Sequence, residues 1–194
     1  MAPRAKPNTS DTRTRLLEAA MSEFIEQGYA GTDTNRIARR AGFAPQTFYR
    51  WFEDKKAILS AVLGVWLETE CRSWQAVLLD QTLPIEQLAD ACVDNARPFL
   101  TFRQHLRSVL LTDETLRLQQ AQARRQLIDQ LAPADAPDAQ RATMAALLSQ
   151  IDALTELLAR DDIALMGLSD APARADLGQL ILRLRQCCIT PSAE

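Results

Sequence analysis

The stretch from Ile37 to Phe52, "IARRAGFAPQTFYRWF", constrains the fold of this chain more than any other part of it. A glycine, Gly42, separates two segments that are too short to be stable helices on their own. Two such helices form a compact unit only if the side chains between them are small or apolar. The positions that would face inward all meet this condition: Ile37, Ala38, Ala41, Phe43, Phe48 and Phe52. The pattern predicts a helix-turn-helix unit that is covered by the preceding helix.

Capping residues predict where the helices of this unit begin and end. Gly28 is expected to end the first helix, because glycine adopts a left-handed cap without a steric penalty. Asp33, or Thr32 beside it, can accept backbone N–H bonds at the start of the second helix. Pro45 suits the first turn of the third helix, whereas Ala44 before it has no capping oxygen. The expected helices are 12–27, 34–40 or 34–41, and 45–51 or 45–52.

The rest of the chain also has the pattern of helices. A fourth, longer helix is expected over 54–79, with Asp54 as its cap, and the period-two alternation typical of strands is missing. Further helices are expected at 84–103, 104–111, 113–131, 139–160 and 173–189. The expected fold is therefore all-α. Its expected parts are a flexible basic arm at 1–11, a helix-turn-helix domain at 12–54, and a larger helical domain at 55–194.

Charge is divided unevenly along the chain. Residues 1–60 hold ten Lys and Arg against seven Asp and Glu, whereas residues 61–194 hold twelve against eighteen. All three lysines lie in the first part. This asymmetry favours a small basic module joined to a larger acidic one.

Several classes of protein are disfavoured by what the sequence lacks. There is no run of about 18 apolar residues, so no membrane span is expected. The N-terminus is polar and basic, unlike a secretory signal, which favours a cytoplasmic protein. The four cysteines form no C-x-x-C pair and there is a single His, so neither a metal site nor a cofactor is expected. No Gly-rich phosphate loop or nucleophile–base pairing is visible, which disfavours an enzyme.

The outward side of the third predicted helix carries polar and aromatic side chains that a core does not need. Gln46 and Thr47 lie in its first turn, where a recognition helix meets base edges in the major groove. Tyr49 has a hydroxyl with the reach for a phosphate, and Lys55, beside Lys56, lies where a helix N-terminus favours an anion. The start of the second helix suits flanking phosphates. The predicted DNA-binding residues are Thr34, Asn35, Arg36, Pro45, Gln46, Thr47, Tyr49, Arg50, Trp51 and Lys55.

Residues 1–60 resemble the DNA-binding domain of the TetR family of transcriptional regulators. The residues that carry the resemblance are Phe24, Gly28, Tyr29, Thr32, "IARRAG" at 37–42, Phe43, Thr47, Tyr49, Phe52, Lys55 and Leu59. Two positions depart from the family pattern, since Ala44 stands where the family often has Ser and Trp51 where it commonly has His. The resemblance implies that 12–54 is a DNA-binding domain and that 55–194 is a ligand-binding and dimerisation domain. This second domain would dimerise through its last two long helices and hold a ligand pocket among its middle helices.

Apolar stripes at helical spacing fit the implied dimer. Two such helices per chain would form a four-helix interface with a partner, and paired half-sites on DNA require two-fold symmetry. The alternative is that these stripes pack inside one chain. The residues expected at the interface are Leu147, Leu148, Ile151, Thr155, Leu158, Leu177, Leu180, Ile181, Leu184 and Cys188.

An aromatic face on the fourth predicted helix fits the implied ligand pocket. Trp66, Glu70 and Trp74 recur every four residues and so share one side of that helix. Two aromatic rings that flank a carboxylate suit a cationic or aromatic ligand. The alternative is that these rings fill a core. The residues expected in the pocket are Trp66, Glu70, Trp74, Phe99, Phe102 and His105.

The residues and the resemblance together predict a ligand-responsive, sequence-specific DNA-binding regulator. Its expected form is a homodimeric repressor that a small-molecule effector releases from a palindromic DNA operator. An alternative from a different class is a helical protein-interaction adaptor whose helix-turn-helix is vestigial. The outward side chains of the third helix separate the two, because an adaptor would have no need for residues suited to DNA at these positions.

Overall fold

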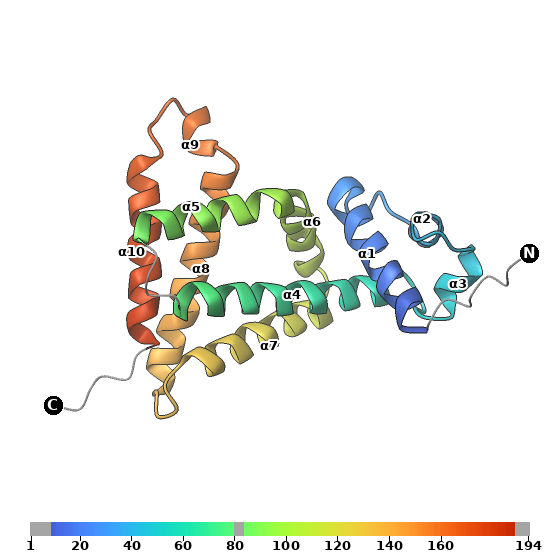
Figure 1. Ribbon diagram of the computed structural model, residues 1–194, viewed down its shortest axis with the longest axis horizontal. Coiled ribbons are helices and arrows are strands. Elements are labelled where there is room, and N and C mark those ends of the chain that lie inside the picture. The colour runs from blue at the N-terminus through green and yellow to red at the C-terminus, as the bar shows by residue number, and fades with distance from the viewer. Residues whose placement is uncertain (1–8, 80–83, 189–194) are drawn as a thin grey trace, which may run out of the picture. The chain divides into compact units, whose positions relative to one another are not determined.

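The computed structural model describes residues 9–79 and 84–188, and every regular element in these residues is a helix (Figure 1). The expected all-α fold is thus confirmed. The elements are α1 (Thr9–Gln27), α2 (Thr34–Arg40), α3 (Pro45–Tyr49), α4 (Lys55–Leu79), α5 (Ile85–Ala96), the 3-10 helix η1 (Arg97–Phe99), α6 (Leu100–Leu110), α7 (Glu114–Leu131), α8 (Asp138–Ala159), α9 (Asp162–Leu165) and α10 (Ala171–Cys187).

The local signals for capping act as predicted. Gly28 and Gly42 both adopt left-handed backbone conformations, with φ of 70° and 77°. The Asp33 carboxylate accepts the backbone N–H of Arg36 at 2.8 Å, and Asp54 accepts that of Ala57 at 2.7 Å. Each of these residues satisfies groups that a helix end would otherwise leave unpaired.

Several boundaries differ from the expected ones: α6 begins at Leu100 rather than 104, α10 begins at Ala171 rather than 173, and the short helix α9 was not expected. Helix α1 begins at Thr9 rather than 12, while residues 1–8 of the predicted arm lie outside the described residues. Helix α3 ends at Tyr49, because the next turn tightens and the N–H of Trp51 bonds to the carbonyl of Phe48 three residues earlier. The segment expected as one helix at 84–103 is divided at η1, where Pro98 has no N–H to donate.

The chain divides into two compact units. The first consists of residues up to Trp66 together with 101–116, so it contains α1 to α3, the start of α4, and nearly all of α6. Its fully buried side chains come from each of these helices: Leu16, Phe24, Ile37, Phe48, Ile58, Leu63 and Phe102. The unit therefore includes a helix, α6, that follows the predicted DNA-binding domain only after more than forty residues of chain.

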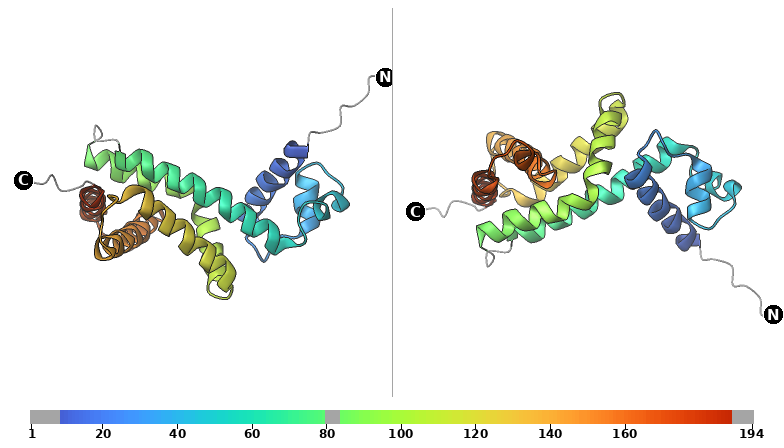
Figure 2. Two further views of the ribbon diagram at one scale, coloured as in Figure 1. Left: turned by 90° about the horizontal axis from the view of Figure 1, so that it is seen from below. Right: turned by 90° about the horizontal axis from the view of Figure 1, so that it is seen from above.

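The second unit, residues 67–100 and 117–194, has a core made mainly by α5, α8 and α10. Helices α8 and α10 lie side by side along their lengths (Figures 1 and 2). Among the residues of this core are Leu88, Val93, Met144, Leu148, Ile151, Leu177 and Ile181.

The interface predicted between two chains is instead part of this core. Eight of the ten predicted residues are buried within one chain, namely Leu147, Leu148, Ile151, Thr155, Leu158, Leu177, Ile181 and Leu184. The other two, Leu180 and Cys188, are partly buried and pack against the same core. A side chain with no accessible surface has none left to bury against a partner, so a dimer through these helices would have to use other residues on their surfaces.

Helix α8 is also the one described helix that is long and apolar enough to cross a membrane, with a mean hydropathy of 1.2 over its most apolar window. The sequence was expected to hold no such segment, because it has no unbroken apolar run of about 18 residues. The mean hydropathy of a window can still be high when polar residues interrupt the run. Of that window, 44% is buried inside the chain. A core helix meets the same criterion, so the composition of α8 is weak evidence for a membrane span.

Candidate DNA-binding site

The turn between α2 and α3 is built by backbone hydrogen bonds at the end of α2. The N–H of Phe43 bonds to the carbonyl of Ala38 at 2.9 Å, and that of Gly42 to Arg39 at 3.0 Å. This pair of bonds is the Schellman arrangement, which requires a left-handed residue at the position of Gly42. The glycine therefore determines the direction in which the chain leaves α2 and enters α3.

Helix α3 buries one side chain and exposes polar ones. Phe48 is fully buried, and its ring packs against that of Phe52 with centroids 5.8 Å apart. Gln46, Tyr49 and Arg50 are exposed, with Tyr49 at 58%. The remaining predicted contacts of this helix, Pro45, Thr47 and Trp51, are partly buried. Anchoring by Phe48 thus leaves the opposite side of α3 open for contact with a partner.

A hydrogen bond joins the start of α2 to the end of α3. The hydroxyl oxygens of Thr34 and Tyr49 lie 2.9 Å apart. Both residues were predicted to contact DNA, and the structure brings them together although fifteen positions separate them in the sequence. The two hydroxyls carry two protons, and the hydrogen bond between them uses one. Each oxygen also keeps a further lone pair. The two together can therefore donate a hydrogen bond to a phosphate oxygen.

Arg36, a third predicted contact, is held within the unit. Its Nε donates to Glu23 at 3.0 Å, and Arg40 donates to the other oxygen of Glu23 at 3.2 Å. Arg40 also pairs with Glu26 at 2.7 Å, and this hydrogen bond is the main cause that lowers the pKa of Glu26. Only 6% of Glu23 is exposed. The network ties α2 to α1 and sets the position of the Arg36 side chain.

Lys55 has an intramolecular role that the sequence did not indicate. Its ammonium donates to the carbonyl oxygens of Tyr29 and Thr32, both at 2.8 Å, and lies 4.3 Å from the centre of the Tyr29 ring. These contacts hold the loop that leads into α2. The neighbouring Lys56 pairs with Asp113 at 2.5 Å, which lowers the pKa of that carboxyl.

Two functional residues of the scaffold were missed by sequence reasoning. Glu23 is an acidic residue on the buried side of α1, between the buried Ala20 and Phe24. An acid at such a position indicates a paired carboxylate, so the sequence could have revealed it. Asp113 also accepts the N–H of Leu116 at 3.1 Å and so caps α7. Its partner Lys56 is far away in sequence, so no local pattern pointed to the pair.

The six residues predicted to line one ligand pocket are divided between the two units. In the first unit, Trp66 and Phe102 are buried and pack edge to face with ring centroids 5.5 Å apart. His105 lies against Gly28, where a Cβ atom would come within 2.6 Å of the imidazole. These rings therefore fill space in the first unit, as the alternative stated.

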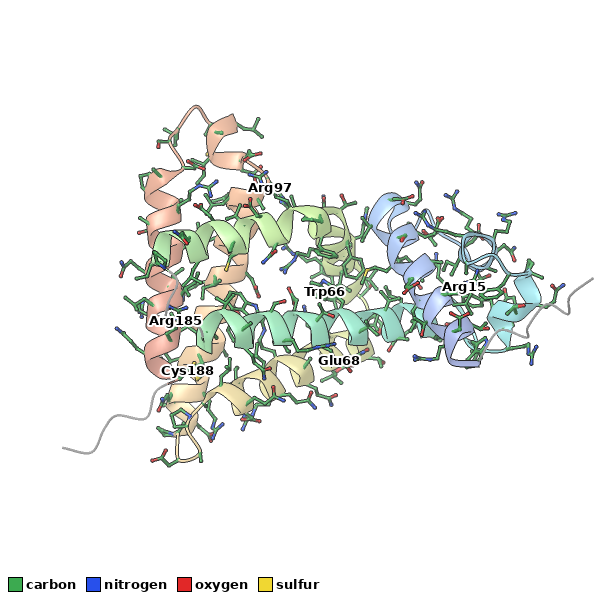
Figure 3. All side chains as sticks on the ribbon, viewed as in Figure 1. Arg15, Trp66, Glu68, Arg97, Arg185 and Cys188 are labelled. Atoms are coloured by element: carbon green, nitrogen blue, oxygen red, sulfur yellow. The ribbon has the colours of Figure 1, made fainter. Side chains whose placement is uncertain are left out.

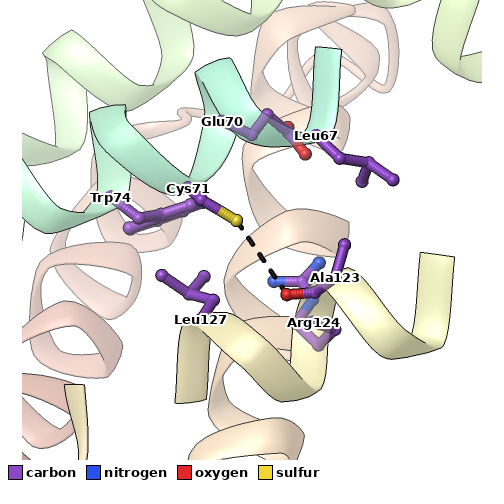
Figure 4. A pocket seen from close by; sticks show the side chains of 7 residues that line it. All are labelled: Leu67, Glu70, Cys71, Trp74, Ala123, Arg124 and Leu127. Carbon is purple, nitrogen blue, oxygen red and sulfur yellow. Dashed lines mark hydrogen bonds between the residues drawn. The ribbon is translucent and has the colours of Figure 1, made fainter. Parts of the chain in front are cut away.

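The other three predicted residues belong to the second unit. Glu70 and Trp74 line a small pocket between α4 and α7 (Figure 4), with Leu67, Cys71, Ala123, Arg124 and Leu127. Phe99, in η1, is not among the lining residues. The cavity volume is ≈ 10 Å³, whereas a single water needs roughly 10–15 Å³. In this conformation the pocket has no room for an organic ligand.

Comparisons with known proteins find a regulatory family in the segment that contains α2 and α3. Residues 16–62 match the family described as bacterial regulatory proteins, tetR family. The transcriptional regulator SrpR of Pseudomonas putida is 33% identical over 89 residues, 41% of this chain and 42% of the relative. The transcriptional repressor KstR2 of Mycolicibacterium smegmatis is 27% identical over 118 residues, 61% of this chain and 57% of the relative. The chain thus spans about half the length of these two relatives.

The fold likeness extends further along the chain than the sequence likeness. The structure of Salmonella enterica GusR superposes with a TM-score of 0.64 at 16% identity, covering 95% of this chain and 100% of that one. At this identity the likeness is one of fold. The matched segment at residues 16–62 contains the turn at Gly42 and all of α3. The helix-turn-helix domain at residues 16–62 therefore belongs to the tetR family of bacterial regulatory proteins.

Proposed function

We propose that this chain is a sequence-specific DNA-binding transcriptional regulator that places α3 in the major groove. The observation that carries the proposal is the exposed polar side of α3, presented opposite the buried Phe48. Gln46 and Thr47 are then the residues that meet base edges, since Gln pairs with adenine through two atoms and a Thr methyl contacts that of thymine. Pro45, Arg50 and Trp51 lie beside them and contact the flanking backbone.

The hydroxyl pair of Thr34 and Tyr49 is the proposed phosphate contact. Asn35, exposed at the start of α2, and Arg36 lie on the same flank. In this proposal Lys55 acts indirectly, by holding the loop before α2, because its ammonium already donates to two carbonyls. Contacts of this kind fix the register of a protein on DNA, while the base contacts supply specificity.

Removing the Tyr49 hydroxyl is expected to weaken DNA binding. Tyr49→Phe should reduce affinity for the cognate duplex by about tenfold, the usual effect of losing one hydrogen bond to a charged group. Fluorescence anisotropy with labelled DNA from upstream of the protein's own gene measures this, against a scrambled duplex and across a salt series. Tyr29→Phe is the matched control, since that tyrosine is partly buried in the same unit. Equal, weak binding of wild-type protein to both duplexes would instead support the adaptor.

We further propose that the regulator acts as a homodimer. The stripes first expected at the interface are buried, so the outward faces of α8 and α10 are the surfaces available. Exposed residues recur there at the same spacing on each helix: Ala142, Ala146, Gln150 and Ala153 on α8, and Ala175, Gln179, Arg183 and Gln186 on α10. The three alanines on α8 leave room for the longer polar side chains of α10 from a partner, as in a four-helix interface. Two-fold symmetry then matches a palindromic operator.

A bulky charge on this surface is expected to separate the dimer. Ala146→Arg should raise the dissociation constant by at least about a hundredfold, because an arginine cannot be buried there without a partner. Sedimentation velocity over a concentration series measures the change. Ala121→Arg, at an exposed alanine of α7, is the control. The proposed interface is wrong if both variants sediment as the wild-type protein does.

The proposed regulator responds to a small-molecule effector and represses transcription in the cytoplasm. The pocket of Glu70, Trp74 and Arg124 is the candidate effector site, and it must open for a ligand to enter, since its cavity volume is only ≈ 10 Å³. A ligand that prefers the open form would lower the affinity of the chain for DNA. DNA would lower the affinity for the ligand by the same factor, with a coupling free energy of about 1–3 kcal/mol. Glu70→Ala and Trp74→Ala are expected to abolish release of DNA by an effector without changing DNA affinity in its absence.

A further inference from the structure

Two arginines of α1 lie against aromatic rings at the two ends of α3. The Arg15 guanidinium is 4.6 Å from the centre of the Phe43 ring, and that of Arg13 is 5.7 Å from the Phe52 ring. Phe43 precedes α3 in the turn, and Phe52 follows α3 before α4 begins. Figure 3 shows Arg15 on α1 in the first unit. Each end of the recognition helix is therefore in contact with a cation from α1.

Arg15 is also bound to the turn itself. Its Nη2 donates to the carbonyl oxygen of Ala41 at 2.7 Å. A Cβ atom on Gly42 would lie only 2.9 Å from the same nitrogen. The turn needs glycine for its left-handed φ of 77°, and a side chain there would also displace the Arg15 guanidinium from its present position. The arginine is packed into the backbone that sets the direction of α3.

Helix α3 depends on such contacts because it has little stability of its own. It contains five residues, and Ala44 before it provides no side-chain cap. A helix this short is not stable in isolation, so its orientation is set by what holds its two ends and by Phe48 between them. Phe48 anchors the helix on its buried side, and the hydrogen bond between Tyr49 and Thr34 joins its end to α2. Contacts at Phe43 and Phe52 restrain both ends against α1 as well.

We propose that Arg13 and Arg15 are positioning residues, which hold the orientation of α3 and thereby determine how sharply the chain discriminates among DNA sequences. This inference rests on the proposed function, because discrimination has meaning only if α3 reads DNA. It differs from the usual role of an arginine near DNA, which is to pair with phosphates and bind all sequences equally. A positioning residue affects affinity for the specific sequence, whereas a phosphate contact affects affinity for every sequence.

The test compares specific and non-specific binding of the full chain. The specific probe is the duplex that the wild-type chain recovers by repeated selection from a random-sequence library, and the non-specific probe is poly(dI-dC). Arg15→Gln is expected to lower affinity for the selected duplex by about tenfold, as expected for losing one cation–π contact and one hydrogen bond. Affinity for poly(dI-dC) and its dependence on salt should match those of Arg72→Gln, which removes a charge from an exposed site on α4.

A direct phosphate contact would give a different result. Affinity for both probes would then fall, and the slope of log affinity against log salt would decrease by about 0.9. That result, or unchanged affinity for both probes, overturns the proposal. Phe43→Leu provides a second variant, since it removes the ring and keeps the charge. The double variant should lose little more than Arg15→Gln alone, whereas fully additive losses would show that Arg15 does not act through Phe43.

Hydrogen exchange tests the same inference without DNA. In Arg15→Gln, amides of residues 43–52 are expected to exchange about tenfold faster, while those of 16–27 keep their wild-type rates. An equal increase in both segments would mean that the arginine only stabilises the unit as a whole, and no increase would mean that it does not hold α3. Either result overturns the proposal. If the wild-type chain recovers no sequence from the library, the proposed function fails, and the exchange measurement still decides the role of Arg15.

Discussion

Replacing Gly28 with alanine is expected to lower the free energy of unfolding by about 2–4 kcal/mol, from left-handed strain and overpacking together. The residue has a φ of 70°, which a side chain tolerates poorly. The new Cβ atom would also lie 2.6 Å from Cε1 of His105 and 2.7 Å from both ring nitrogens. The imidazole is a rigid ring, and its Nδ1 is buried, so the ring cannot move aside without displacing its surroundings. Urea denaturation followed by circular dichroism measures the loss.

Gly167 separates the two causes of this loss. Its φ is 74°, close to that of Gly28, but a Cβ atom there would meet nothing within 4 Å. Gly167→Ala should therefore cost only the backbone strain, roughly 1 kcal/mol. Adding His105→Ala to Gly28→Ala should recover part of the loss, because it removes the ring that the methyl group meets. The explanation fails if Gly28→Ala and Gly167→Ala cost the same, or if His105→Ala gives no recovery.

Replacing Glu23 with alanine has the second large expected effect, a loss of about 2–3 kcal/mol of unfolding free energy. Only 6% of this residue is exposed, and its carboxylate accepts from Arg36 at 3.0 Å and Arg40 at 3.2 Å. Its backbone carbonyl accepts the Thr32 hydroxyl at 3.2 Å and would remain. The variant thus tests the side chain alone. Chemical denaturation measures stability, and DNA affinity should fall as well because α2 loses its connection to α1.

Glu26 provides the matched comparison for Glu23. It lies on the same helix and also pairs with Arg40, but its side chain is 48% exposed. Solvent screens a pair of this kind, so Glu26→Ala should have a much smaller effect on stability than Glu23→Ala. Glu23→Gln should fall between the two, since an amide oxygen still accepts a hydrogen bond without the charge. Equal effects at positions 23 and 26 would show that burial of the carboxylate does not matter here.

Local features of the chain were predictable because neighbouring residues determine them. The left-handed glycines at 28 and 42, the cap at Asp33 and the start of α3 at Pro45 all follow from interactions within a few positions. The inward set of the helix-turn-helix was also correct at Phe48 and Phe52, since helical spacing brings such residues to one side. The break at Pro98 was equally local, and attention to the missing N–H would have found it.

Long-range features could not be predicted in the same way. The spacing of Leu148, Ile151 and Leu177 shows that one face of each helix is buried, but not whether a partner or the same chain buries it. Trp66 and Trp74 share a helix face by their spacing, yet the division of the chain assigns them to different units. Periodicity describes one helix at a time, so it carries no information about what lies opposite.

By itself, the sequence therefore determined the helical class, the helix-turn-helix and the outward residues of α3, because hydrogen bonds and steric limits within a few residues specify them. Only the tertiary structure decided that His105 packs on Gly28, that Glu23 joins Arg36 to Arg40, and that the stripes of α8 and α10 form an internal core. Each of these depends on the meeting of segments far apart in the chain. Such a meeting is set by how all the helices pack together, and no single segment encodes it.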